Sequence, residues 1–179
     1  MPARYEKMAD PVEIRALNEA DPETISSSFQ ILGFCKPPAQ YRRYLAEQAS
    51  GSRTCLVATT DKQFAGYLTV NWMPAYLPFA DSKIPEIQDL NVLPAFRRRG
   101  IATQLLDRAE GEIALRCGAV GISVGLHPGY NQAQRLYVKR GYIPDGRGVT
   151  YRYQCVKEGM QILLDDHLLL HLTKHLVRS

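Results

Sequence analysis

Apolar residues recur at two different spacings in the second half of the chain. Between residues 100 and 116 they lie four positions apart, at Ile101, Leu105, Ala109 and Ile113. This spacing keeps the side chains on one side of a helix, so it predicts a helix over about residues 100–116 with one apolar face. Residues 119–126 alternate apolar side chains with glycine and serine, which predicts a strand with one small face. A small face admits close packing or a ligand.

Shorter patterns predict the remaining elements. Strands are predicted over residues 12–16, 54–59, 65–72, 86–93 and 168–173. Helices are predicted over about residues 22–31, after Pro37 and Pro38, and over about residues 129–142, where Gly141 supplies a C-terminal stop. Segment 73–85 contains three prolines and is predicted to be a loop. Strands that alternate with helices indicate an α/β protein.

Length and composition predict one domain over residues 1–179, because a chain of this size with 45% hydrophobic residues suffices for one sizeable core. The N-terminus lacks the apolar run of a signal peptide, and no stretch approaches the roughly 18 apolar residues of a membrane span. We therefore expect a cytoplasmic protein with no membrane partner. The oligomeric state is left open, and a homodimer is one alternative.

The cysteines are scattered along the chain, at Cys35, Cys55, Cys117 and Cys155. They show no paired Cys-x-x-Cys spacing, which argues against a zinc site and gives no disulfide framework, so reduced and mostly buried thiols are expected. The net charge of +4 is too small to indicate a nucleic-acid partner by itself. It does suit a ligand that carries several phosphate charges.

The segment from Asp89 to Thr103 has the form of an anion site. An extended apolar segment runs through an arginine-rich turn, residues 97–99, and through Gly100 directly into the predicted helix. The first backbone N–H groups of a helix have no carbonyl partner within it, and the helix dipole adds positive potential there. Gly100 allows the backbone to approach a phosphate closely, and the arginines add permanent charge.

The spacing Arg97-x-x-Gly100-x-Ala102 after Leu90-x-Val92-x-Pro94 resembles the acetyl-CoA pyrophosphate loop of the GNAT-family N-acetyltransferases. The resemblance implies the GNAT fold, a mixed and mostly antiparallel central sheet flanked by helices, and acetyl-CoA as co-substrate without a metal. It implies that the backbone of Leu90, Asn91 and Val92 pairs with the pantetheine arm. It also implies that the pyrophosphate is held by the backbone amides of Arg98, Arg99, Gly100, Ile101, Ala102 and Thr103, around which Arg97 adds charge and hydrogen-bond donors.

A second segment supports the resemblance. Residues 129–142 are similar to the family's Asn-to-Leu-Tyr-x-x-x-Gly-aromatic segment, with Tyr137 at the tyrosine position. The family's asparagine commonly lies seven residues before that tyrosine, where this chain has Tyr130, and Asn131 comes one place later. Both residues are expected beside the cofactor, with Tyr130 two helical turns before Tyr137 and on the same side.

Transfer of an acetyl group to an amine requires a base for the ammonium proton and an acid for the departing thiolate. Glu86 is the candidate base, because it resembles the glutamate that several family members use, directly or through water. A carboxylate near its reference pKa of about 4.3 is a weak base, so burial or a water chain is required. The alternatives are that Glu86 is a solvated strand-edge carboxylate, or that Asp89 is the base. Strict alternation places Asp89 on the opposite face unless the strand is bulged.

Tyr137 is the candidate acid, since a phenol with a reference pKa of about 10 can protonate or hydrogen-bond a thiolate near about 8.5. The alternative is a tyrosine that only packs in the core. Nucleophilic covalent catalysis has little support, because the chain has no Gly-x-Ser-x-Gly motif and no cysteine with a histidine at a suggestive spacing.

Other functions have less support in the sequence than acetyl transfer. His167, His171 and His175 recur every fourth residue, but the leucine-rich run around them predicts a strand rather than a metal-binding helix. The arginine cluster is disfavoured as a nucleic-acid patch because it flanks a helix start. The alternative function is that of a GNAT-like module that binds acyl-CoA without turnover. The acceptor is expected to be a small-molecule or peptide amine, for which residues 29–43 and 72–79 offer aromatic surface or packed core.

Overall fold

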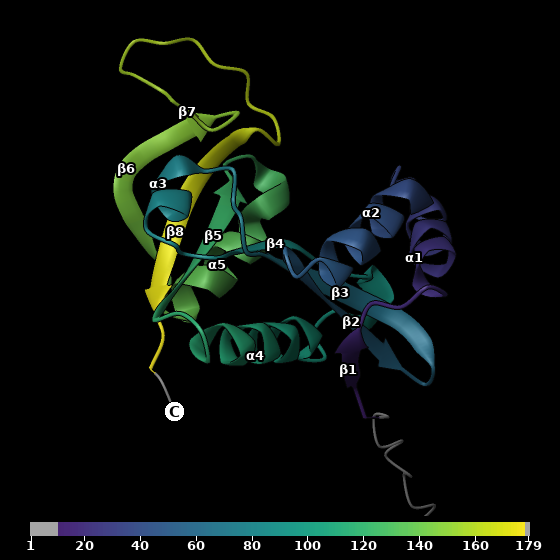
Figure 1. Ribbon diagram of the computed structural model, residues 1–179. Coiled ribbons are helices and arrows are strands. Elements are labelled where there is room, and N and C mark those ends of the chain that lie inside the picture. Colours follow the sequence, from purple (N-terminus) through teal and green to yellow (C-terminus); the bar gives the residue numbers. More distant parts are fainter. Residues whose placement is uncertain (1–10, 178–179) are drawn as a thin grey trace, which may run out of the picture.

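The computed structural model describes residues 11–177, and one mixed sheet runs through this part of the chain (Figure 1). Its strand order is β1-β2-β3-β4-β5-β8-β6-β7. The strands are β1 (Glu13–Ala16), β2 (Arg53–Thr60), β3 (Gln63–Asn71), β4 (Glu86–Val92), β5 (Ala119–Gly125), β6 (Ile143–Tyr151), β7 (Gln154–Cys155) and β8 (Leu168–His175). The β4–β5 pair is parallel and the other pairs are antiparallel. The predicted α/β fold with a mostly antiparallel sheet is confirmed.

Helices cover both faces of this sheet. They are α1 (Asp21–Gln30), α2 (Pro38–Ala49), α3 (Leu77–Asp81), α4 (Ile101–Ala114) and α5 (Asn131–Lys139), with 3-10 turns η1 (Pro94–Phe96) and η2 (Pro128–Tyr130). The predicted apolar face of α4 is buried and packs on Leu56, Leu68 and Ile87. The intervening side chains Cys55 and Tyr67 pack instead against α1 and α2. Successive strand residues point to opposite faces, so α1 and α2 lie on the other side of the sheet from α4.

The parallel pair β4–β5 opens into a fork. The two strands pair only at Glu86 with Gly121 and at Ile87 with Ile122. Beyond this point β4 continues along β3, while β5 continues along β8, and Figure 1 shows the two strands diverging. Among the described residues the β5 side of β4 has no further strand partner after Ile87. Backbone N–H and C=O groups on that side are therefore available to an extended ligand.

A bulge interrupts β4 next to the fork. Thr69 of β3 faces Gln88 while Tyr67 faces Asn91, so β4 carries one extra residue opposite Leu68. Asp89 absorbs the irregularity in a left-handed conformation with φ of 52°. The strict alternation that separated Asp89 from Glu86 therefore fails, since a bulge shifts the facing of the residues around it.

Three expectations from the sequence are wrong. Segment 73–85 is not all loop, because α3 forms within it after the N-cap residue Tyr76, with a proline at its first turn. Tyr130 does not lie in the helix of Tyr137, since η2 ends at Tyr130 and α5 begins at the next residue. The thiols are not mostly buried, because Cys55 is buried while Cys35 and Cys155 are exposed.

Two further features complete the description. The strand predicted from Leu168 is confirmed and extends to His175. The small face of β5 is filled by aromatic rings: a Cβ at Gly121 would stand within 2.7 Å of three ring carbons of Phe79. Over residues 11–177, no helix combines the length and the apolar character that a bilayer crossing requires.

Candidate active site

The N-terminus of α4 lies after the end of β4 and points free N–H groups outward. Gly100 is its N-cap residue, with φ of 76°, and no side chain caps the helix. The first amide to bond within the helix is that of Gln104, which donates to the Gly100 carbonyl at 3.0 Å. The amides of Ile101, Ala102 and Thr103 precede it and have no intrahelical acceptor. A Cβ at Gly100 would meet only the side-chain Nε2 of Gln104, at 3.9 Å, so a ligand can approach.

The three arginines before Gly100 are exposed. Arg97 donates from Nε to the carbonyl of Val92 at 3.1 Å, which joins the turn to the end of β4. Arg98 has a left-handed backbone with φ of 62°. The Arg99 guanidinium lies 5.4 Å from the ring centre of Phe96. The turn therefore surrounds the helix start with positive charge, which favours an anion.

The predicted pantetheine segment, residues 90–92, lies just beyond the bulge and is half-buried. Leu90 and Val92 pack their side chains against the core cluster under α4. Asn91 donates from Nδ2 to the carbonyl of Asp89 at 3.0 Å, so its side chain holds the bulge. A ligand along this segment can therefore bind the backbone N–H and C=O groups on the side of β4 where β5 no longer pairs.

Glu86 lies at the base of the fork and is only 1% exposed. Its carboxylate accepts a hydrogen bond from Gln88 Nε2 at 2.7 Å and another from the Ser123 hydroxyl. Burial raises the pKa of Glu86, while these two hydrogen bonds and the charge of Arg53 oppose the rise. The alternative of a solvated strand-edge carboxylate is wrong.

Asp89 lies on the α2 side of the sheet because of the bulge. Its carboxylate accepts hydrogen bonds from the Tyr44 hydroxyl and, at 3.5 Å, from Gln40 Nε2. Across the fork, burial raises the pKa of Tyr153, and the negative charges of Glu86 and Asp89 raise it further. Both carboxylates therefore lie near enough to Tyr153 for their charges to act on its phenol.

Tyr137 projects from α5 with its ring buried at 6% exposure, 6.0 Å from the ring centre of Tyr142. Burial raises the pKa of its phenol. Within residues 11–177 the Tyr137 hydroxyl makes no hydrogen bond, and no fully buried side-chain N or O atom there lacks a partner. The phenol oxygen is therefore not sealed in the core, and it is available to a bound molecule.

Tyr130 and Asn131 occupy different surroundings. The ring of Tyr130 covers Gly125, where a Cβ would stand within 2.9 Å of three of its carbons. Its hydroxyl donates to Asp166 Oδ1 at 3.1 Å, and burial followed by the Asp166 charge raises its pKa to about 12. Asn131 starts α5 and is exposed. Tyr130 is thus held by the segment before β8.

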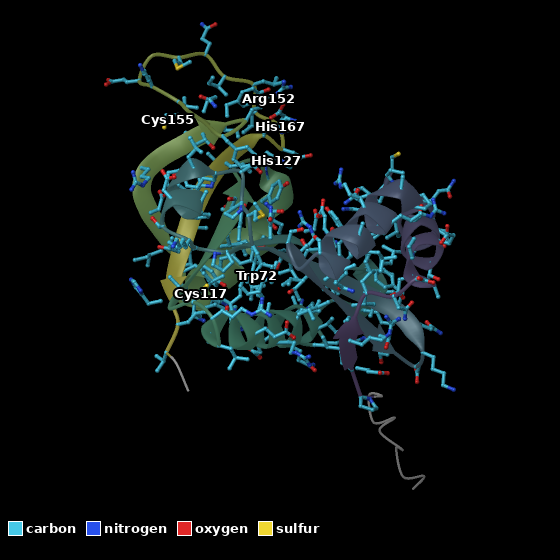
Figure 2. The ribbon with its side chains drawn as sticks, viewed as in Figure 1. Trp72, Cys117, His127, Arg152, Cys155 and His167 are labelled. Atoms are coloured by element: carbon cyan, nitrogen blue, oxygen red, sulfur yellow. The ribbon has the colours of Figure 1, made fainter. Side chains whose placement is uncertain are left out.

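The labelled histidines and Arg152 lie in one part of the structure, and Trp72 lies in another. Figure 2 shows His127, His167 and Arg152 near one another, at the end of the sheet where β5 stops. Trp72 lies apart from them, toward α4, and carries the Arg116 guanidinium 4.7 Å from its ring centre. Trp72 also packs against the core cluster that contains the apolar face of α4.

The aromatic segment 72–79 is largely packed. Tyr76 and Phe79 are buried, at 2% and 1% exposure, while Met73 and Leu77 are exposed. This segment was expected to be either aromatic surface for the acceptor or packed core, and Tyr76 and Phe79 belong to the packed core. Among residues 11–177 there is no group of three or more His, Cys, Asp or Glu side chains arranged to hold a metal ion.

Sequence comparison identifies the family. The model of the acetyltransferase (GNAT) family matches residues 17–142. The chain belongs to the GNAT acetyltransferase family. None of the curated protein sequences matches the chain. The resemblance drawn from the turn at Gly100 and from the Tyr137 segment is confirmed at the level of the family.

Solved structures of GNAT proteins share the fold. Ribosomal-protein-alanine N-acetyltransferase from Brucella melitensis superposes with a TM-score of 0.67 at 18% identity, over 92% of this chain and 99% of that one. An N-acetyltransferase from Staphylococcus aureus gives 0.68 at 14% identity, over 92% and 98%. NAA60 from Arabidopsis thaliana, solved with a bisubstrate analogue, gives 0.67 at 18% identity, over 94% and 100%. At these identities the likeness concerns the fold.

Ser123 contacts Glu86, and His171 contacts Ser123, but neither residue is singled out as a site residue by the sequence. The alternation over residues 119–126 indicates only a small face for Ser123, and His171 is one of three regularly spaced histidines. In the sheet they are directly opposite each other on β5 and β8. The local patterns gave no signal for this, because the contact depends on which strands pair.

Proposed function

We propose that this chain, acting as one domain over residues 1–179 in the cytoplasm, transfers an acetyl group from acetyl-CoA to an amine. The transfer is direct, within a ternary complex, and uses no metal. The observation that carries this proposal is the fork between β4 and β5, which opens from the buried Glu86. A carboxylate, a strand edge without a partner on the β5 side and a helix N-terminus follow one another along β4 and into α4, which supports the proposal.

The features of this path fit acetyl-CoA. The backbone of Leu90, Asn91 and Val92 is available to the amides of the pantetheine arm, as β5 no longer pairs there. The pyrophosphate is assigned to the amides and side chains of the loop and first turn, which are Arg97, Arg98, Arg99, Gly100, Ile101, Ala102 and Thr103. Tyr130 and Asn131 are assigned to the opposite wall. Acetyl-CoA supplies the activated thioester, and the residues of this chain bind it and move protons.

Glu86 is the proposed base. It receives the proton of the acceptor ammonium, directly or through water, and the burial that raises its pKa makes it a better proton acceptor than an exposed carboxylate. Asp89 is the second candidate, since its charge acts on Tyr153 as that of Glu86 does. Tyr137 is the proposed acid, because its phenol oxygen has no partner among residues 11–177 and can protonate or hydrogen-bond the departing thiolate.

The acceptor is proposed to be a peptide or small-molecule amine. The proteins of similar fold include a ribosomal-protein-alanine N-acetyltransferase and a spermidine N-acetyltransferase chimera. Peptide amines and polyamines are therefore both included in the test. The purified chain is incubated with acetyl-CoA and a panel of peptide N-termini, polyamines and amino sugars, and free CoA thiol is measured. Amine-dependent thiol release supports the proposal. Tight acetyl-CoA binding without any release across the panel would instead identify a sensor or scaffold module.

A further inference from the structure

The Ser123 hydroxyl bridges Glu86 and His171. Its oxygen lies 2.7 Å from Nδ1 of His171, and it also contacts Oε1 of Glu86. On the far side of the imidazole ring, Nε2 of His171 lies 2.8 Å from the hydroxyl of Thr150. Four strands, β4, β5, β8 and β6, each contribute one side chain to this line. Thr150 and His171 lie outside the residues that the family model matches.

The number of hydrogens decides the direction of these bonds. A carboxylate can only accept, so an ionised Glu86 takes the single hydroxyl hydrogen of Ser123. The oxygen of Ser123 must then accept from Nδ1–H of His171. In a neutral imidazole the other nitrogen carries no hydrogen, so Nε2 accepts from the Thr150 hydroxyl. One arrangement thus satisfies all four side chains.

His171 is enclosed by aromatic rings that favour its neutral form. It is 0% exposed, Tyr76 stacks on it with ring centres 3.6 Å apart and planes at 10°, and Phe79 meets it edge-on at 5.8 Å. Burial lowers the pKa of His171 to about 4, opposed by the charge of Asp145 on β6. The imidazole is therefore neutral at physiological pH.

Among residues 11–177, Arg53 is the charged group that acts on Glu86, and Tyr153 feels the charges of both Glu86 and Asp89. Arg53 comes from β2, Asp89 from β4, and Tyr153 from the turn that follows β6. Arg53 already forms an ion pair with Glu47, and Asp89 is negative. The hydroxyl of Ser123 is therefore a main source of stabilisation for a negative charge on Glu86, beside the amide of Gln88.

We propose that Ser123 and His171 are positioning residues for the transfer. His171, in its Nδ1–H form, turns the Ser123 hydroxyl hydrogen toward Glu86 and so holds Glu86 as a carboxylate that can accept the amine proton. The catalytic part of this inference rests on the proposed function of Glu86. The tautomer of His171 and the ionisation of Glu86 are properties of the protein alone and can be measured without any substrate.

The first experiment titrates Glu86 by carboxyl 13C NMR, with its signal identified by its loss in Glu86→Gln. A hydrogen bond to a charged group is worth about 1.5–3 kcal/mol, so Ser123→Ala should raise the pKa of Glu86 by about one to two units. His171→Leu should raise it in the same direction. His171→Asn should restore much of the wild-type value, because its amide N–H can take the place of Nδ1–H.

A matched control separates this role from general packing. Tyr76→Phe keeps the ring that stacks on His171 and removes only the hydroxyl that donates to Asp145 at 2.7 Å, so it should leave the pKa of Glu86 unchanged. Ser123→Ala removes a single oxygen, so the test stands even if His171→Leu fails to fold. An unchanged Glu86 titration in folded Ser123→Ala overturns the proposal.

The second experiment reads the tautomer from ring 15N shifts of labelled histidine, with His171 assigned through His171→Asn. Hydrogen on Nδ1 at neutral pH supports the proposal, and hydrogen on Nε2 or on both nitrogens overturns it. In the active enzyme, the acid limb of kcat/KM should move upward in Ser123→Ala together with the Glu86 pKa. If the protein shows no acetyltransferase activity but gives both NMR results, the proposed function is wrong and the Glu86–Ser123–His171 arrangement stands.

Discussion

The ring of Phe79 occupies the space where a side chain of Gly121 would stand. A Cβ built on this glycine falls within 2.7 Å of three ring carbons, and the same ring meets the edge of His171. The absence of a side chain on β5 therefore lets α3 settle on the sheet beside the residues around Glu86.

Gly121→Ala should lower the free energy of unfolding by about 1–3 kcal/mol, since overpacking forces a buried ring or the backbone to shift. Denaturant unfolding measures this change. Gly111→Ala is the matched control, because a Cβ there meets nothing within 4 Å and the residue lies within α4. The control should stabilise the protein slightly, as alanine is the better helix former. Equal stability of Gly121→Ala and wild type would contradict the packing described for Phe79.

Gly100→Glu should abolish acetyl-CoA binding. The new side chain enters the space before the first amides of α4 and brings negative charge against the pyrophosphate, and the φ of 76° adds backbone strain. Isothermal calorimetry on the folded variant measures the affinity. Gly118→Glu adds the same charge beyond the other end of α4, in open space, and should bind normally. Unchanged affinity in Gly100→Glu would show that the pyrophosphate lies elsewhere.

Glu86→Gln should reduce the rate at neutral pH and move half-maximal activity to higher pH. The amide keeps the shape of the side chain but cannot take a proton, so hydroxide or another base must act in its place. The acid limb of the wild type should lie above the reference range of a carboxylate, because burial raises the pKa of Glu86. The pH dependence of kcat/KM checks both points. Identical profiles in the two proteins would transfer the role to Asp89 or to solvent.

Tyr137→Phe should lower turnover by about 10² to 10⁴ with little effect on acetyl-CoA affinity, because it removes only the hydroxyl. Single-turnover rates and melting temperatures are measured on the same preparations. An acyl donor with a lower thiol pKa should recover part of the rate, since its thiolate needs less help to leave. Reduced stability with normal turnover would instead mean that Tyr137 only packs in the core.

Acid should destabilise the fold through His171. Its pKa is lowered to about 4 from 6.5, so between these pH values the unfolded chain binds a proton at this residue that the folded chain does not. Stability should therefore fall as the pH drops from 6.5 toward 4, by about 3 kcal/mol at most. Denaturant unfolding across this range should show a shallower decline in His171→Asn. Parallel curves would mean that the ring titrates normally in the folded protein.

The periodic and local features of this chain were readable in its sequence. The face of α4 that carries Leu105 and Ala109, and the Arg97–Gly100 turn that precedes it, depend on neighbours within a few residues. Local spacing is enough to predict such features. A helix repeats every 3.6 residues, and the first amides of any helix lack an intrahelical acceptor. The family resemblance followed from these short segments.

Other features were decided by the tertiary structure. The bulge that turns Asp89 toward Tyr44 depends on the register of β3 against β4. The proline-containing segment before β4 holds α3, whose Phe79 ring packs over Gly121 of β5. Ser123 and His171 are 48 residues apart and meet only because β8 pairs with β5. Strand pairing brings distant segments together through backbone hydrogen bonds that are the same for every side chain, so no local pattern in the sequence specifies which strands become neighbours.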